Sequence, residues 1–297
     1  MKITVLDDTR CHLGEGPVWD EAEQALYWVD SLGPTIYRHD WATRTTARWV
    51  PPGESIGSLT LRAGDGLILA MDNGLHRFDL STGASTAIAE PLAPIEEAHF
   101  NDGKVDRAGN FVAGGVHGNE GVLDPQPVCP MVRLNADHEI TTVMEQFLCF
   151  NGPCFSPDGA TLYVNGRGNM QNIEALPYDS ETGIVDEAAG CILIDGINPD
   201  GTTVDAEGTL WSAQWDDHCV LGISTARGMN GDITGRIELT GQVVSSVMFG
   251  GPDLDIMFVT TLGKPHWGTT PEAKDAGAVF MIEGTGLKGI AEKRFAG

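Results

Sequence analysis

The sequence has few cations and no long apolar run, and both shortages narrow the classes of protein it can belong to. Eighteen Lys and Arg stand against 42 Asp and Glu, which gives a formal net charge of −24 at pH 7. A chain this acidic repels phosphate groups, so we expect neither a nucleic-acid partner nor binding to an anionic membrane. No stretch of about 18 apolar residues occurs, so we expect no membrane-spanning helix.

The cysteines also lack a pattern. None of the six belongs to a CxxC pair, and only Cys149 and Cys154 are close together. In a chain of this length, such scattered cysteines favour reduced thiols that are buried as small hydrophobic side chains. The N-terminus has no apolar stretch of the kind that marks a signal peptide. These features predict a soluble, cytoplasmic protein.

Helical periodicity is missing as well: no long window places apolar residues on one face of a helix. A short pattern recurs instead, roughly every 40 to 50 residues, which is a period typical of repeat folds. It consists of an apolar residue, a turn built from Asp, Gly, Pro or Ala, and a strand rich in aliphatic and aromatic residues. The six copies begin at Val18, Leu61, Val105, Phe155, Val204 and Phe249.

Each copy is typical of two strands joined by a tight turn, and further strand signals follow it. Six units of about four strands predict an all-β fold, a six-bladed β-propeller that forms one domain over residues 1–297. The strand KITV at residues 2–5 has no unit of its own, so we expect it to complete the last blade and close the ring. The alternative is a pair of β-sandwiches, in which the six turns would recur at a regular spacing only by chance.

The start of each unit carries the candidate functional residues. In a propeller the first strand of each blade lines the central channel, and residues at the same phase form a ring around it. That phase falls on Gly57 and Ser245 in units two and six. In units one, three, four and five it falls on oxygen-bearing side chains: Glu15, Asn101, Asn151 and Asp200.

Two carboxylates and two amides suit a hard divalent cation such as Ca²⁺, Mg²⁺ or Mn²⁺. Zn²⁺ accepts carboxylate oxygens too, although it usually takes His or Cys as well. The alternative is that Asn and Asp only shape turns at these positions. Four such residues at one phase favour a metal site in the central channel.

The motifs around these residues resemble those of the SMP-30/gluconolactonase family, also called the regucalcin family. They are GEGPVW at 14–19, FNDGKVD at 100–106, NGP at 151–153, PDG at 199–201 and FGGPD at 249–253. The resemblance covers essentially the whole chain. It implies a six-bladed propeller with one divalent metal ion bound by Glu15, Asn151 and Asp200, and it implies hydrolysis of sugar-acid lactones. It also implies that Asn101 contacts the substrate beside the metal.

Two positions depart from the family pattern. Several members have an Arg two residues before the substrate-binding Asn, and this chain has His99. A family acidic residue on the following loop falls near Asn119 or Glu120, which makes Glu120 a further candidate for substrate binding. A neutral imidazole is a shorter and weaker anchor than a guanidinium group. We therefore expect a substrate that is smaller, less polar or differently oriented than gluconolactone.

The sequence supports a mechanism as a hypothesis. The metal polarises the lactone carbonyl, a water attacks the carbonyl carbon, and Asp200 acts as the general base. Asn101 is considered as a donor to the oxyanion, and His99 as a donor to substrate hydroxyls. Hydrolysis of another ester or an organophosphate on the same metal stays open, as does a non-catalytic calcium- or ligand-binding propeller. The expected oligomeric state is a monomer or a small homo-oligomer.

Three loops are further candidates for the pocket wall, although each is also typical of an ordinary surface loop. They contain His117 with Glu120, Trp215 to His218, and His266 with Trp267. A nucleophile elbow of the form G-x-S-x-G and a Walker-type phosphate loop are both absent from the sequence. Cys154 is expected in the core.

Overall fold

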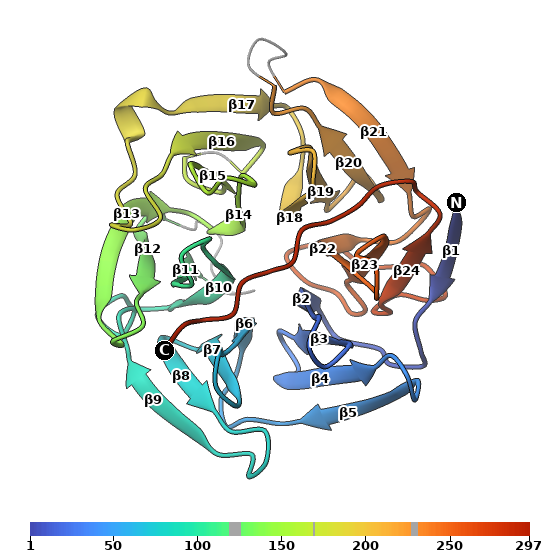
Figure 1. Ribbon diagram of the computed structural model, residues 1–297, viewed down its shortest axis with the longest axis horizontal. Helices are drawn as coiled ribbons and strands as arrows, with labels where there is room; N and C mark the ends of the chain where they lie inside the picture. Colours follow the sequence, from blue (N-terminus) through green and yellow to red (C-terminus); the bar gives the residue numbers. More distant parts are fainter. Residues whose placement is uncertain (119–125, 169, 227–230) are drawn as a thin grey trace.

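The computed structural model describes residues 1–118, 126–168, 170–226 and 231–297, which form six four-stranded antiparallel sheets arranged as a ring (Figure 1). This confirms the predicted six-bladed propeller. Blade one contains β2 (Gly14–Asp20), β3 (Ala25–Asp30), β4 (Thr35–Asp40) and β5 (Thr45–Trp49). Blade two contains β6 (Ile56–Leu61), β7 (Leu67–Met71), β8 (Gly74–Phe78) and β9 (Ser85–Ala89). Blade three contains β10 (Ala98–Val105), β11 (Phe111–His117), β12 (Cys129–Leu134) and β13 (Ile140–Phe147).

The second half of the ring repeats this order from the innermost to the outermost strand. Blade four contains β14 (Asn151–Phe155), β15 (Thr161–Asn165), β16 (Asn172–Pro177) and β17 (Cys191–Asp195). Blade five contains β18 (Pro199–Val204), β19 (Leu210–Gln214), β20 (Cys219–Ile223) and β21 (Ile233–Glu238). Blade six contains β22 (Val244–Gly250), β23 (Ile256–Thr261), β24 (Phe280–Glu283) and β1 (Lys2–Val5).

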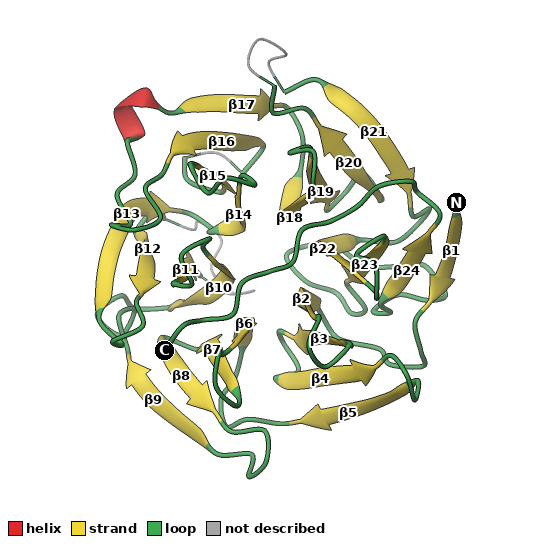
Figure 2. Cartoon of the chain, viewed as in Figure 1, coloured by secondary structure: helices red, strands yellow, loops and turns green. Residues whose placement is uncertain are grey.

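The first strand of the chain closes the ring, as predicted. β1 pairs with β24 in antiparallel register, from Lys2 opposite Glu283 to Val5 opposite Phe280. The two strands lie side by side at the edge of the ring (Figure 1). Helix is nearly absent from the described residues, where one 3₁₀ turn at Glu187–Ala189 interrupts the strands and loops (Figure 2). Within the described ranges no helix is long and apolar enough to cross a membrane.

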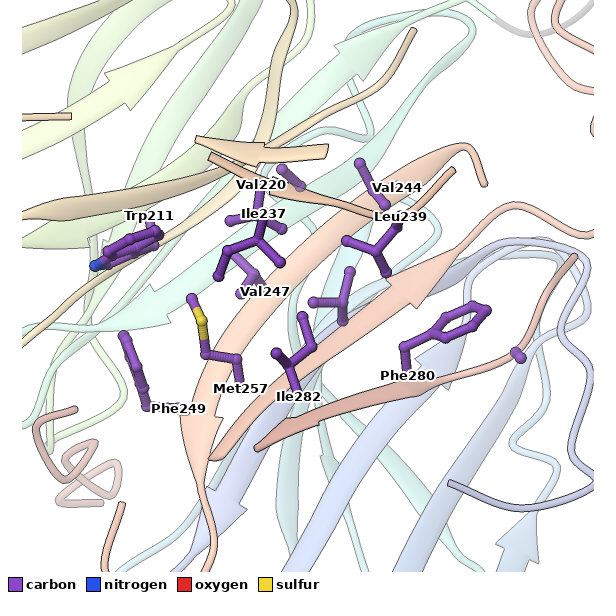
Figure 3. Packing of buried hydrophobic residues seen from close by; sticks show 13 residues of the cluster. Trp211, Val220, Ile237, Leu239, Val244, Val247, Phe249, Met257, Phe280 and Ile282 are labelled. Atoms are coloured by element: carbon purple, nitrogen blue, oxygen red, sulfur yellow. The ribbon is translucent and has the colours of Figure 1, made fainter. Parts of the chain in front are cut away.

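Apolar side chains fill the space between neighbouring blades. Figure 3 shows the packing between blades five and six, where alternate residues of facing strands interdigitate. Its members include Trp211, Val220, Ile237, Val247, Met257 and Ile282. Burying each such aliphatic side chain contributes about 1.5–3 kcal/mol, so these layers fix how the blades sit against one another. The channel walls are therefore rigid supports for the side chains they carry.

The repeated turn that marks each unit in the sequence has a clear structural role. In blade three, buried Asp106 accepts hydrogen bonds from the backbone N–H of Asn110, from Arg133 Nε at 3.3 Å and from the Tyr178 hydroxyl at 2.8 Å. In blade five, Asp205 takes the same place and accepts from Trp211 Nε1 at 2.9 Å. Both carboxylates close the turn between the first two strands of their blade, and Asp106 also joins that turn to blade four through Tyr178.

The last residues, 284–297, form a segment that we call the C-terminal strap, and it crosses one face of the ring (Figure 1). Its backbone N–H groups donate to three different blades: Gly289 to Leu254 O, Phe295 to Leu61 O and Ala296 to Gly109 O. Each contact lies near the end of a blade's innermost strand or the turn that follows. The strap therefore covers the end of the channel that lies opposite the first residues of those strands.

Candidate active site

All six innermost strands share an irregularity near their start. In each one the register with the second strand shifts, for example between Glu15 and Val18 and between Asn151 and Cys154. Gly16 and Gly152 follow those two side chains with φ angles of 52° and 58°, a left-handed conformation that glycine adopts without strain. Such bulges turn a side chain out of the regular alternation. The Gly-containing motifs of the sequence are therefore the bulges that aim side chains into the channel.

The predicted ring is present at this level. Gly57 occupies the phase in blade two, where a Cβ atom would lie 2.0 Å from the backbone oxygen of Asn101, so only glycine fits between blades two and three. Ser245 occupies it in blade six and donates to Gly14 O at 2.6 Å. The remaining positions hold the four oxygen-bearing side chains.

These side chains line one cavity of about 290 Å³. Glu15, Asn101, Asn151 and Asp200 all contribute to its wall, and so does His99 at the start of β10. The structure thus brings together every site residue predicted from the sequence with one exception. Glu120 lies outside the described residues, and its role stays a prediction.

Negative charge is concentrated at the base of this cavity. Asp200 is buried, with 5% of its surface exposed, and Glu15 is partly buried opposite it. Burial raises the pKa of Glu15 well above its usual range, and repulsion from Asp200 and Asp102 raises it further. Burial also raises the pKa of Asp200, together with repulsion from Asp102. Carboxylates placed this way either take up a proton or hold a cation between them.

Asp102 is a third acidic group at the site, and it was not singled out as a site residue from the sequence. Its carboxylate accepts hydrogen bonds from Gly103 N at 2.7 Å and from Gly152 N at 2.9 Å, so it ties blade three to the bulge beside Asn151. Burial raises the pKa of Asp102 to about 6, while Lys104 acts in the opposite direction. The Nζ atom of Lys104 in turn lies 3.7 Å from Oε1 of Glu292 in the C-terminal strap. Charges of alternating sign therefore continue from the cavity toward the strap.

The amide of Asn101 is held in one orientation by the next blade. Its Nδ2 donates to Phe150 O at 2.9 Å and contacts Cys149 Sγ at 3.4 Å. Both amide hydrogens are therefore engaged, and Oδ1 is the amide atom left for a ligand. This geometry favours Asn101 as an acceptor, in contrast to the donor role considered from the sequence.

The donor set fits a hard divalent cation. The described residues contain no group of three or more His, Cys, Asp and Glu side chains arranged to hold a metal ion, so a metal here depends on amide oxygens as well. Glu15 and Asp200 supply two charged oxygen donors, and Asn101 and Asn151 can supply two neutral ones. Oxygen ligands of this kind suit Ca²⁺, Mg²⁺ or Mn²⁺. A cation would also relieve the repulsion between the buried carboxylates.

An aromatic corner forms the outer wall, and it joins two loops that are distant in sequence. Trp215 follows β19, while His266 and Trp267 belong to the loop between β23 and β24, and all three line the cavity with Asp216. Trp215 Nε1 donates to Thr269 Oγ1 at 3.0 Å. Of the segment from Trp215 to His218 that was predicted as a pocket wall, Trp215 and Asp216 line the cavity, and Asp217 and His218 do not. For His266 and Trp267 the structure favours the pocket interpretation over an ordinary surface loop.

Some expectations need correction. His117 ends β11 and does not line the cavity, and its Nδ1 accepts from Gln126 N at 3.0 Å. Cys149 lines the cavity and Cys191 is exposed, whereas the sequence suggested buried thiols throughout. The physical reason is position: Cys149 enters β14 at the channel mouth, and Cys191 begins an outermost strand. Cys154 is buried in the core as predicted, and all six cysteines are free.

Several pocket residues gave no signal in the sequence. They come from loops and strand ends beside the cavity: Leu13, Ser31, Leu32, Val116, Met170, Gln171 and Asn198. Their residue types are common in any loop. Only the ring geometry shows that they meet.

Comparisons with known proteins identify the family of this chain. Residues 13–263 match the family model described as SMP-30/Gluconolactonase/LRE-like region. Pentonolactonase XacC of Haloferax volcanii is 32% identical, with 95% of this chain and 94% of that protein covered. The 6-deoxy-6-sulfogluconolactonase of Pseudomonas putida is 31% identical, with 96% and 95% covered.

A solved structure gives the same result at the level of the fold. The calcium-binding protein regucalcin of Agrobacterium tumefaciens superposes with a TM-score of 0.84 at 25% identity, with 98% of this chain and 96% of that chain covered. The family match spans most of the chain and includes β2, β10, β14 and β18, which carry the four oxygen-bearing side chains of the ring. The protein therefore belongs to the SMP-30/gluconolactonase family.

Proposed function

We propose that this protein is a lactone hydrolase that depends on a divalent metal ion bound by Glu15, Asn151 and Asp200. The observation that carries the proposal is the placement of two carboxylates, from blades one and five, at the base of one cavity beside two amides. A protein that only needed a stable channel would gain from apolar residues there, because buried like charges destabilise the fold. The names of the relatives support the reaction class, since two of the most similar ones are lactonases.

The chemistry can be assigned to the residues of this chain. A divalent cation at this site would act as a Lewis acid on the lactone carbonyl. Asp200 accepts a proton from the attacking water as general base, because its carboxylate is buried at the cavity floor. Asn101 presents Oδ1 to the water or to a substrate hydroxyl, since its Nδ2 is held by Phe150 O. The water oxygen bonds to the carbonyl carbon, the ring C–O bond breaks, and Asp200 passes its proton to the leaving ring oxygen, so that a hydroxy acid results.

His99 and the aromatic corner complete the arrangement. His99 lines the same cavity as Asp200 and contacts substrate hydroxyls. The wall formed by Leu32, Met170 and Trp215 limits the water around the reacting bond. Exclusion of water strengthens each electrostatic contact at the site.

Two measurements test the proposal directly. The purified protein is analysed for bound metal, and a panel of aldonolactones is assayed with a pH indicator before and after EDTA treatment. We expect hydrolysis that EDTA abolishes and that Ca²⁺, Mg²⁺, Mn²⁺ or Zn²⁺ restores. Full activity after complete removal of metal would overturn the metal mechanism. Tight metal binding without turnover of any lactone would point to a non-catalytic binding protein. Turnover of only phosphotriesters or simple esters would point to the alternative activity, hydrolysis of another ester or an organophosphate on the same metal.

A further inference from the structure

The outer part of the candidate active site has an unusual charge pattern. Among the described residues that line the cavity there is neither a Lys nor an Arg. Besides Glu15 and Asp200, the lining includes a third carboxylate, Asp216, which lies exposed at the rim. The whole chain adds a net charge of −24. An anionic substituent that points toward the rim would therefore meet the carboxylate of Asp216 and no Lys or Arg side chain among these residues.

His99 and His266 are the basic groups nearest to a ligand. An imidazole forms hydrogen bonds with hydroxyls through its ring nitrogens, and it lacks the fork of donors with which a guanidinium group holds a carboxylate or phosphate. Neither His99 nor His266 supplies the permanently charged, bidentate donor group that pairs with a carboxylate, phosphate or sulfonate.

The aromatic corner is built to receive an uncharged group. The ring centroids of Trp215 and His266 are 6.4 Å apart, and those of His266 and Trp267 are 6.0 Å apart. Isolated β-bridge pairing between His266 and Thr269 holds the loop, and Thr269 also accepts the hydrogen bond from Trp215 Nε1. The corner therefore presents indole surface in fixed positions. Such surface favours C–H groups of a sugar or a short alkyl group over a hydrated anion.

The cavity is also small. Its volume of about 290 Å³ lies at the lower limit of about 300–1,000 Å³ that is typical of ligand pockets. It has room for roughly ten water-sized molecules, which suits a single lactone ring with a short side arm. A disaccharide lactone or a lactone with a long acyl tail would extend beyond the aromatic corner.

We propose that this site selects uncharged monomeric lactones whose side arm is short and weakly polar, and that it discriminates against lactones that carry a second, anionic group. This inference rests on the proposed lactonase function and specifies the substrate class for it. The ring carbonyl lies toward Glu15 and Asp200, the ring hydroxyls lie toward His99, and the side arm lies against Trp215 and Trp267. A carboxylate, phosphate or sulfonate on that arm would lose its hydration beside Asp216 without gaining a partner.

The test compares three lactones of one hexonic acid configuration with the metal-loaded wild-type protein. One has its terminal hydroxyl, one is the terminal-deoxy analogue, and one carries a terminal sulfonate. We expect kcat/KM for the deoxy lactone to equal or exceed that for the hydroxylated one, and to exceed that for the sulfonate by about 100-fold, because a like charge at the rim is costly. Equal rates for all three would overturn the inference while leaving lactone hydrolysis intact. No hydrolysis of any of them would overturn the proposed function itself.

Two variants test the location of the selectivity. Trp267→Arg adds a cation at the rim, where 39% of the Trp267 surface is exposed, so the variant should fold normally. His99→Arg adds a cation deeper in the cavity. We expect each to raise the ratio of sulfonate to deoxy turnover by at least about tenfold. His138→Arg makes the same change of residue at an exposed position outside the cavity and should leave the ratio unchanged. If Trp267→Arg leaves the ratio of sulfonate to deoxy turnover unchanged, the rim does not contribute to selection of the side arm.

Discussion

Asn101 on β10 donates its amide nitrogen to the carbonyl oxygen of Phe150, the residue that immediately precedes β14, at 2.9 Å. This bond joins two blades at the level of the candidate metal centre. It also orients the amide so that Oδ1, and not Nδ2, faces the cavity. The same amide contacts Cys149 Sγ at 3.4 Å, so the orientation has two supports.

The variant Asn101→Asp tests this orientation. It replaces the donor by an oxygen that would face the Phe150 carbonyl, and a buried acceptor pair without a proton costs about 1–3 kcal/mol. We expect a loss of stability of that size in urea unfolding and a drop in kcat of at least about 10-fold. Asn135→Asp, in a surface turn outside the cavity, is the matched control: it also loses a donor, to Glu139 Oε2, but this pair is exposed, so it should cost less stability and leave kcat unchanged. A stable and active Asn101→Asp protein would show that the amide hydrogens are not required.

The variant Glu15→Gln separates metal binding from folding. In metal-free protein it removes a charge that Asp200 and Asp102 repel, so the melting temperature should rise. In metal-loaded protein it removes a charged ligand, so the added stabilisation by Ca²⁺ or another divalent ion should fall sharply. Thermal melts with and without EDTA measure both effects. Asp216→Asn, at the exposed rim of the same cavity, should shift neither curve by a comparable amount.

Asp102 predicts a pH dependence for the metal-free protein. Its pKa rises on folding from 3.8 to about 6, so the folded state holds the proton more tightly than the unfolded chain does. The stability that this proton provides is present below about pH 4 and is lost as the pH rises through about 6. Asp102→Asn lacks this titrating group. As the pH rises from about 4 to about 6, the free energy of unfolding of Asp102→Asn should therefore increase relative to that of the wild type. Urea unfolding in EDTA at several pH values measures the difference, and a constant difference would contradict the assignment.

The C-terminal strap predicts a stability contribution far from the site. The Phe295 side chain is fully buried among residues of blades two and three, so Phe295→Ala should cost about 3–5 kcal/mol. Chemical unfolding measures this cost. Ile233→Ala, at a position that is more than half exposed, should cost little. A small effect of Phe295→Ala would mean that the strap is loosely attached.

The sequence predicted the parts of this molecule that repeat. Six turns of the type seen at Asp106 and Asp205 recur because each closes the same hairpin, and the bulges at Gly16 and Gly152 recur because each aims a side chain inward. Period and phase were therefore sufficient to place Glu15, Asn151 and Asp200 on one ring.

The parts that do not repeat were harder to predict. His266 and Trp267 lie in a loop whose length is particular to blade six, and their neighbour Trp215 belongs to blade five. The orientation of Asn101 depends on Phe150, which is 49 residues away. Contacts of this kind form between different blades, so the periodicity of the sequence does not predict them.

The strap has one more consequence, which concerns the order of events in a catalytic cycle. Residues 284–297 cross the far end of the channel, and Glu292 Oε1 lies 3.7 Å from Lys104 Nζ between the strap and the site. The opening beside Asp216 and Trp267 is therefore the route that the cavity itself offers to a substrate and to its product. Under the proposed function, opening a lactone at neutral pH would release an acid anion, and that anion would leave past Asp216 in a strongly acidic protein. The same repulsion that disfavours a charged substrate would hasten the exit of the charged product and leave the passage clear for the next molecule.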